Sequence, residues 1–258
     1  MTLLLGGLLL IASVLLGAAI VVFLHQFNQA KIIKVLLALS GGFLLSIAFI
    51  HFIPEMYAHN SPHIGYYILL GFLIQLFLEY FSGGIEHGHI HVPDKKGTMP
   101  WTLFIALSIH AVFEALPLES QMLPELIDES MNHIGHSHAH QHVAGEYGGR
   151  NSYLIGVILH KIPEAVALMT LLLAAEFSKK KVWTVIVVFA LMSPLGMLLG
   201  HYGSKIILFN TDTVLAVVVG MFLHISTTII FESSDNHQFN FLKLISILAG
   251  VGLAILVM

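Results

Sequence analysis

Cysteine is absent from the 258 residues, and charged side chains are scarce. Without cysteine the chain forms no disulfide and no thiolate metal site, so binding of a soft metal must use histidine or methionine. Charged residues make up 10% of the chain, with 11 Lys and Arg against 15 Asp and Glu. No basic run is long enough to follow a phosphate backbone, so we do not expect nucleic acid as a partner.

Hydrophobic residues are abundant instead, at 57% of the chain. This is more than one soluble core could bury, which excludes the class of soluble globular proteins. The chain also contains 17 histidines beside its 15 carboxylates. That ratio is unusual, and it is the first indication of function.

Apolar stretches of about 20 residues are long enough to cross the hydrocarbon core of a bilayer. Eight such stretches predict an all-α membrane protein with eight transmembrane helices. Their approximate bounds are 2–24, 35–54, 65–82, 101–118, 152–175, 182–200, 213–231 and 239–258. Neither of the longest loops, 83–100 and 119–150, shows the pattern of a packed domain, so residues 1–258 are predicted to form one transmembrane domain.

The basic residues between the spans predict the orientation of the chain. If the N-terminus lies outside, the inner loops hold Lys31, Lys34, Lys95, Lys96, Lys179, Lys180, Lys181 and Lys243. The outer loops then hold only Arg150 and Lys205. Basic residues concentrate on the cytoplasmic side of membrane proteins, so both termini are expected outside.

Two spans place ionisable side chains deep in the membrane. The fourth contains His110 and Glu114, and the fifth contains His160 and Glu164. A spacing of four residues puts the imidazole and the carboxylate on one helix face, about 6 Å apart along the axis. Buried charge costs at least ~2.5–3.5 kcal/mol per group, so these residues indicate a function.

Two such faces turned toward each other would make a pocket with four ligands. Two imidazoles and two carboxylates suit a borderline divalent ion, most naturally Zn²⁺, with Fe²⁺, Mn²⁺, Co²⁺ and Cd²⁺ as alternatives. Pro117 and Pro163 follow within the same spans, so we expect both helices to be kinked beside their ligands.

Polar side chains also occur near the ends of other spans. His51 and Glu55 repeat the four-residue spacing at the outer end of the second span and could form an entrance site. The alternative is an ordinary interfacial helix end. A set toward the inner side could form an exit relay, or could simply be solvated: His25, Glu79, His224 and Glu232.

The eight spans and the paired His-xxx-Glu and His-xx-Pro-Glu segments resemble the ZIP (Zrt/Irt-like) family of divalent-metal transporters. The resemblance implies a helical bundle in the cell membrane that moves zinc or a related metal toward the cytoplasm. It also implies a homodimer and an elevator-like motion, in which spans one, four, five and six slide against spans two, three, seven and eight.

Three positions depart from the commonest family pattern. Ala111 stands where many members have Asn, Lys161 where they have Asp, and Ser193 where Glu often precedes the proline. These changes remove the ligands of a second adjacent metal and are similar to a family branch with Lys in the fifth span. Lys161 could supply the charge of that second cation, although a lysine could instead extend to the membrane interface.

Two loops are rich in histidine and could raise the local metal concentration as weak, adaptable chelators. The inner loop contains His87, His89 and His91, and the outer loop contains His133, His136, His138, His140 and His142. The alternative is a hydrophilic loop with incidental histidines. Either way, we expect the loops to be dispensable for the transport chemistry.

Three other classes of function are alternatives to uptake. An intramembrane zinc-dependent hydrolase would use the metal to activate water, but the chain has no H-E-x-x-H motif. A metal sensor using only the loops would leave the costly intramembrane charges unexplained, and an exporter would share the same topology. Transport, without enzymatic activity, is the prediction.

Overall fold

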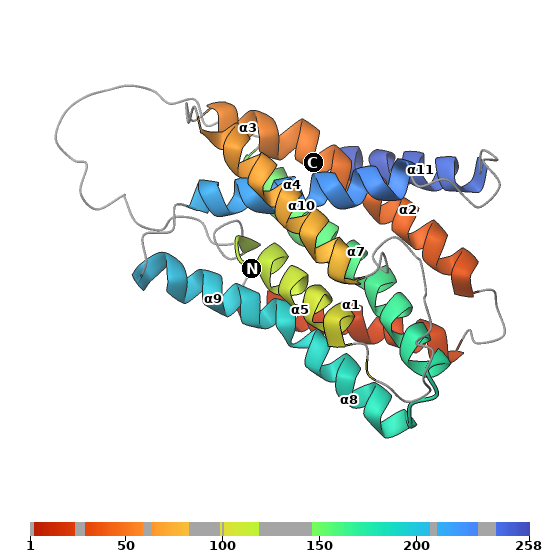
Figure 1. The fold of residues 1–258 in the computed structure, drawn as a ribbon. Helices are drawn as coiled ribbons and strands as arrows, with labels where there is room; N and C mark the ends of the chain where they lie inside the picture. The colour runs from red at the N-terminus through yellow and green to blue at the C-terminus, as the bar shows by residue number, and fades with distance from the viewer. Residues whose placement is uncertain are drawn as a thin grey trace, which may run out of the picture.

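The apolar stretches form helices in the computed structural model, which describes residues 3–23, 29–58, 63–82, 99, 101–118, 146–206, 211–231 and 241–258. The helices are α1 (Leu3–Phe23), α2 (Gln29–Ile47), α3 (Ile53–Ala58), α4 (Ile64–Ser82), α5 (Trp101–Ala115), α7 (Glu146–Ala174), α8 (Lys179–Ala190), α9 (Met192–Ile206), α10 (Thr211–Phe231) and α11 (Phe241–Val257). A π-helical turn, η1 (Ala48–Phe52), joins α2 to α3. Figure 1 shows the helices packed side by side. No strand occurs within the described residues, which confirms the all-helical prediction.

Six helical segments of the described chain are long and apolar enough to cross a membrane: Leu3–Phe23, Lys31–Ala58, Ile64–Phe81, Ser152–Ala174, Lys179–Gly203 and Thr211–Phe231. The other two predicted spans correspond to shorter apolar helices, Trp101–Ala115 and Phe241–Val257. The fourth span is short because α5 ends at Ala115, two residues before Pro117. Proline lacks the N–H that would continue the helical hydrogen bonds, so a helix commonly ends just before it.

Two prolines lie within continuous helical segments of the described chain. Pro163 lies inside α7, which stays helical from Glu146 to Ala174. The second span continues past Pro54, because the π-turn η1 precedes it and the N–H of Ile53 bonds to the carbonyl of Ala48. A π-turn widens the helix locally, which relieves the clash of a proline ring with the preceding turn.

Glycines let pairs of helices approach closely. A Cβ atom on Gly71 of α4 would overlap the carbonyl of Val217, and one on Gly220 of α10 would overlap the carbonyl of Ile68. The same relation joins three further helix pairs: Gly42 and Gly250 join α2 to α11, Gly196 and Gly200 join α9 to α5, and Gly17 joins α1 to α7. Small residues of this kind support close backbone packing in membranes, where lipid provides no hydrophobic drive for association.

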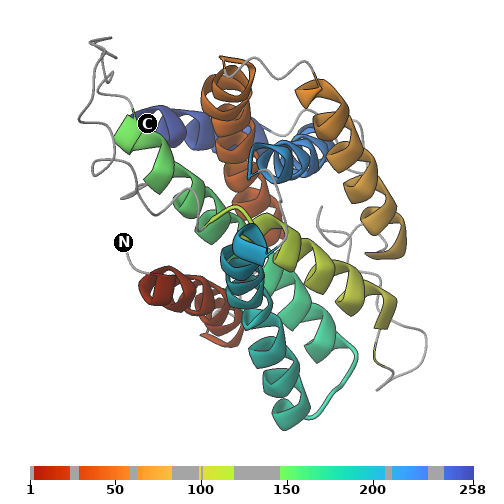
Figure 2. The same cartoon turned by 90° about the vertical axis from the view of Figure 1, so that its left-hand side faces the viewer.

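The described helices form two halves according to the helices that they pack against. The first half comprises α1, α5, α7, α8 and α9, and the second half comprises α2, η1, α3, α4, α10 and α11. Each glycine-to-carbonyl approach described above joins helices of the same half. Figure 2 shows α1, α8 and α9 on one side and α2, α4, α10 and α11 on the other, with α7 (green) running from one side to the other. The halves meet where α7 packs on α2 and where α5 packs on α4.

Candidate metal centre

The two His-xxx-Glu segments lie on α5 and α7, and each presents both side chains on one face of its helix. On α5, Nε2 of His110 lies 3.3 Å from Oε2 of Glu114. On α7, Nε2 of His160 lies 3.1 Å from Oε1 of Glu164. The four-residue spacing therefore produces the local pairs expected from helix geometry.

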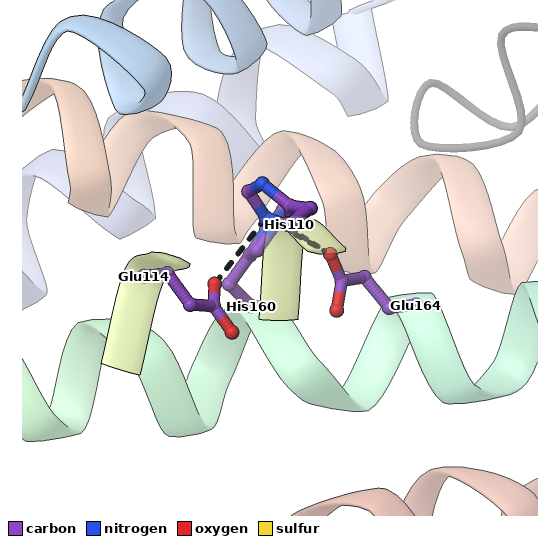
Figure 3. Close-up of side chains that lie close together, drawn as sticks. All are labelled: His110, Glu114, His160 and Glu164. Atoms are coloured by element: carbon purple, nitrogen blue, oxygen red, sulfur yellow. Dashed lines mark ion pairs between the residues drawn. The ribbon is translucent and has the colours of Figure 1, made fainter. Parts of the chain in front are cut away.

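The pair on α5 also faces the pair on α7. Nε2 of His110 lies 3.3 Å from Oε1 of Glu164, and the two imidazole centroids are 5.8 Å apart. One ligand atom from each of His110, Glu114, His160 and Glu164 can be chosen so that all lie within 4.8 Å of one another. Figure 3 shows the four side chains converging between the two helices. We call these four residues the central site.

The spacing of the ligand atoms fits a small divalent ion. Zinc bonds of 2.0–2.2 Å at a tetrahedral angle place neighbouring ligand atoms about 3.3–3.5 Å apart. Three separations between imidazole nitrogen and carboxylate oxygen are 3.3, 3.3 and 3.1 Å. Small side-chain movements would bring these atoms to the spacing of a tetrahedral shell.

Apolar layers close the central site on both sides. All four side chains are buried, with at most 1% of any residue exposed. Along α7, Val157 belongs to one apolar cluster and Ala165 to another, so His160 and Glu164 lie between them. Along α5, Ala111 and Ala115 belong to the same two clusters. The site is thus closed to water from both directions in this conformation.

Lys161 lies inside the central site and does not extend to the membrane interface. Its ammonium is fully buried, 2.5 Å from Oε2 of Glu164, and it also forms an ion pair with Oε1 of Glu114. The ring of Phe189 lies 5.3 Å away and adds a cation–π contact. Each carboxylate therefore directs one oxygen to the lysine and the other toward the imidazoles.

The ion pairs with Lys161 use the carboxylate oxygens that face away from the imidazoles, and they set the formal charge of the site. With neutral imidazoles, Glu114, Glu164 and Lys161 together carry a formal charge of −1. A divalent ion would change this charge to +1.

The C-terminal part of the chain can be compared with known families. Residues 151–258 match the ZIP zinc transporter family. This match confirms the resemblance predicted from the sequence, and the matched region contains the α7 part of the central site, His160, Lys161 and Glu164. The matched family is one of zinc transporters, and the buried His/Glu group is of a kind that could hold a metal ion. No curated protein matches the chain.

Two further predicted groups come together as pairs outside the central site. His51 of η1 and Glu55 of α3 lie 3.4 Å apart, with 24% and 42% of their side chains exposed. His224 of α10 and Glu79 of α4 lie 3.3 Å apart, and the ring of Phe72 packs against the imidazole of His224. The second pair comes from helices far apart in the chain and links the ZIP-matched region to the preceding part.

The remaining predicted residues lie outside the described residues. They are His25 and Glu232 of the exit set and the loop histidines His87, His89, His91, His133, His136, His138, His140 and His142. Their roles stay predictions.

The structure also places two residues at the central site that the sequence analysis missed. Gln75 of α4 is fully buried, and its Oε1 lies 3.0 Å from Nδ1 of His110. Tyr153 of α7 donates its hydroxyl to the backbone carbonyl of Glu114 at 2.5 Å. A glutamine in the middle of an apolar span was a usable signal, because a buried amide needs a partner. Tyr153 offered none, since a tyrosine near a span end is commonly interfacial.

Proposed function

We propose that the protein transports Zn²⁺ across the cell membrane toward the cytoplasm, with His110, Glu114, His160 and Glu164 as the ligands of the transported ion. The observation that supports this most is the convergence of two nitrogens and two carboxylates in a fully buried site on apolar helices. This ligand set suits a borderline divalent ion, so Fe²⁺, Mn²⁺, Co²⁺ and Cd²⁺ are the expected competitors.

A single transmembrane domain over residues 1–258 with eight crossings is part of the proposal. The spans would be α1, α2 with η1 and α3, α4, α5, α7, α8 with α9, α10 and α11. The supporting observations are six spanning-length segments and two shorter apolar helices. An even number of crossings puts both termini on one side, and the positions of the basic residues favour the outside.

Metal movement is proposed to follow an elevator-like displacement of the first half, as the transport half, against the second half, as the scaffold half. All proposed ligands of the central site lie on α5 and α7, which belong to the transport half. Close backbone approaches at glycines join α1 to α7 and α5 to α9 in the transport half, and α4 to α10 and α2 to α11 in the scaffold half, which supports joint movement of each pair. We further propose a homodimer, as the family resemblance implies.

Each His–Glu pair outside the central site has a proposed position on the path of the transported ion. His51 and Glu55 would receive the ion at the outer entrance, and their partial exposure supports access from solvent. His224 and Glu79, with His25 and Glu232, would pass the ion toward the inner side. The histidine-rich loops would capture metal without forming the barrier.

The hydrolase alternative fits this site poorly. A catalytic zinc keeps three protein ligands and leaves one position open for water. Here four protein ligands converge, enough to fill a tetrahedral shell, and apolar clusters lie on either side. This arrangement favours holding and passing an ion over activating water.

Zinc uptake by proteoliposomes tests the proposal. We expect the double variant Glu114→Ala, Glu164→Ala to abolish zinc flux. Because it leaves Lys161 buried without a counter-charge, a charge-balanced variant should be measured beside it: Glu114→Gln, Lys161→Met, Glu164→Gln. Asp212→Asn, which removes a carboxylate from the first turn of α10, is the matched control and should transport normally. Normal zinc flux by the folded charge-balanced variant would show that the central site is not the transport site.

A further inference from the structure

The two histidines of the central site have different surroundings on the side away from the carboxylates. Nδ1 of His110 contacts Oε1 of Gln75 at 3.0 Å, and both residues are fully buried. Nδ1 of His160 is also buried, and among the described residues it has no hydrogen-bond partner. Only one of the two proposed imidazole ligands is therefore held at its second nitrogen by a side chain of another helix.

The contact with Gln75 determines which nitrogen of His110 carries the hydrogen. A carboxamide oxygen only accepts hydrogen bonds, so Nδ1 must donate. In a neutral imidazole, Nε2 then keeps its lone pair. Nε2 is the atom that lies 3.3 Å from both Glu114 and Glu164, so the lone pair is available where the metal would bind.

Gln75 is fully buried, one turn from an apolar cluster. Leu78, one turn along α4, packs in a cluster with Ala106 of α5 and Met221 of α10, and Ala106 lies one turn before His110. Burying an amide in such a layer is costly unless it is hydrogen-bonded. The bond to His110 offsets this cost and ties Gln75 to a ligand.

This bond also crosses the boundary between the two halves of the molecule. Gln75 is on α4, which packs closely on α10 through Gly71 and Gly220, whereas His110 is on α5. A displacement of one half against the other by even part of a helical turn would break a 3.0 Å contact. The orientation of His110 therefore depends on the relative position of the halves.

We propose that Gln75 is a positioning residue for the metal ligand His110, holding the imidazole in the tautomer and orientation that expose Nε2 to the metal. The proposal rests on the proposed function, because it takes His110 to be a ligand. Its consequence is a site with higher metal affinity when the halves are placed as seen here than when the bond is broken.

Metal affinity of the purified full-length protein provides the test, with Co²⁺ as the probe. The visible absorption of tetrahedral Co²⁺ distinguishes the central site from weak, octahedral binding at the loops. We expect Gln75→Met, similar in size but unable to accept from the imidazole, to weaken binding about 10–100-fold. Gln75→Glu retains an acceptor and should bind at least as well as the wild type. Leu78→Met, a change one turn away on α4, is the control for packing and should bind the metal normally.

A double-mutant cycle with His110→Ala separates positioning from general packing. If Gln75 acts through the imidazole, Gln75→Met should have no further effect on affinity once His110 is removed. An equal loss in both backgrounds, or wild-type affinity in Gln75→Met, would overturn the inference and leave the proposed function intact. Wild-type affinity in His110→Ala would instead overturn the ligand set itself, and this inference with it.

Discussion

Replacing Lys161 by Met should destabilise the metal-free protein and strengthen metal binding. The ammonium is fully buried and forms ion pairs with Glu114 and Glu164, whose side chains are also fully buried. Removing one partner from a buried charge network costs about 3–5 kcal/mol, because the remaining charges lose their compensation. We therefore expect the free energy of unfolding of metal-free Lys161→Met to fall by this amount.

Bound metal should reverse much of that loss. Without the lysine, the two carboxylates give the site a charge of −2, which a divalent ion neutralises. In the wild type the same ion leaves an excess of +1, so the variant should bind metal more tightly and release it more slowly. An ion at 100 times its dissociation constant adds about 2.7 kcal/mol of stability, which would offset most of the deficit relative to the metal-free wild type.

The assay is unfolding of the purified protein in detergent, followed with chelator and with saturating zinc. Lys180→Met, the same change at an exposed position in the first turn of α8, is the control and should shift stability by less than about 0.5 kcal/mol. Proteoliposomes should show a lower maximal rate for Lys161→Met, and lower still for Lys161→Asp, which adds another negative ligand. If metal-free Lys161→Met were as stable as the wild type, or if it bound zinc more weakly, the assigned role of the lysine would be wrong.

Three other predictions can be measured. Gly220→Ala should lower stability by about 1–3 kcal/mol, because the added Cβ meets the carbonyl of Ile68. Gly252→Ala, with open space at that position, is the control and should be neutral or stabilising. Equal effects of the two changes in thermal unfolding would contradict the close packing of α4 and α10. Deleting residues 133–142 should raise the apparent KM for zinc with little change in maximal rate, and complete loss of flux in a folded variant would place this loop on the path. With the loop histidines replaced, the protein should bind one metal ion per chain, because Lys161 contacts the carboxylate oxygens that a second ion would need. Two tightly bound ions per chain would refute the single-metal site.

Much of the fold was predictable because membrane helices are encoded locally. Six of the eight predicted spans coincide with long apolar helical segments, and the other two with shorter ones. The ends of the helices were harder to predict where a proline occurs. α5 ends before Pro117, while the second span passes Pro54 with the help of η1 and α7 passes Pro163. Whether a proline ends a helix depends on what can satisfy the freed carbonyl, which neighbouring helices decide.

The four residues of the central site could be predicted from the sequence, but their contacts with residues on other helices could not. Four-residue spacing alone puts His110 beside Glu114 and His160 beside Glu164, because both pairs are set by one helical turn. The cost of burying charge indicated that the two pairs would meet. Gln75 was missed because its partner lies 35 positions away, on a different helix.

The sequence by itself determined the helical membrane class, the residue types of the metal site and their order along each helix. These depend on hydropathy and on the helical repeat, which are properties of neighbouring residues. Tertiary structure alone decided that Glu114 of α5 contacts Lys161 of α7, that Glu164 reaches His110, and that Gln75 contacts the other side of that imidazole. These contacts join separate helices, so they depend on how those helices pack and cannot be deduced from spacing within one helix.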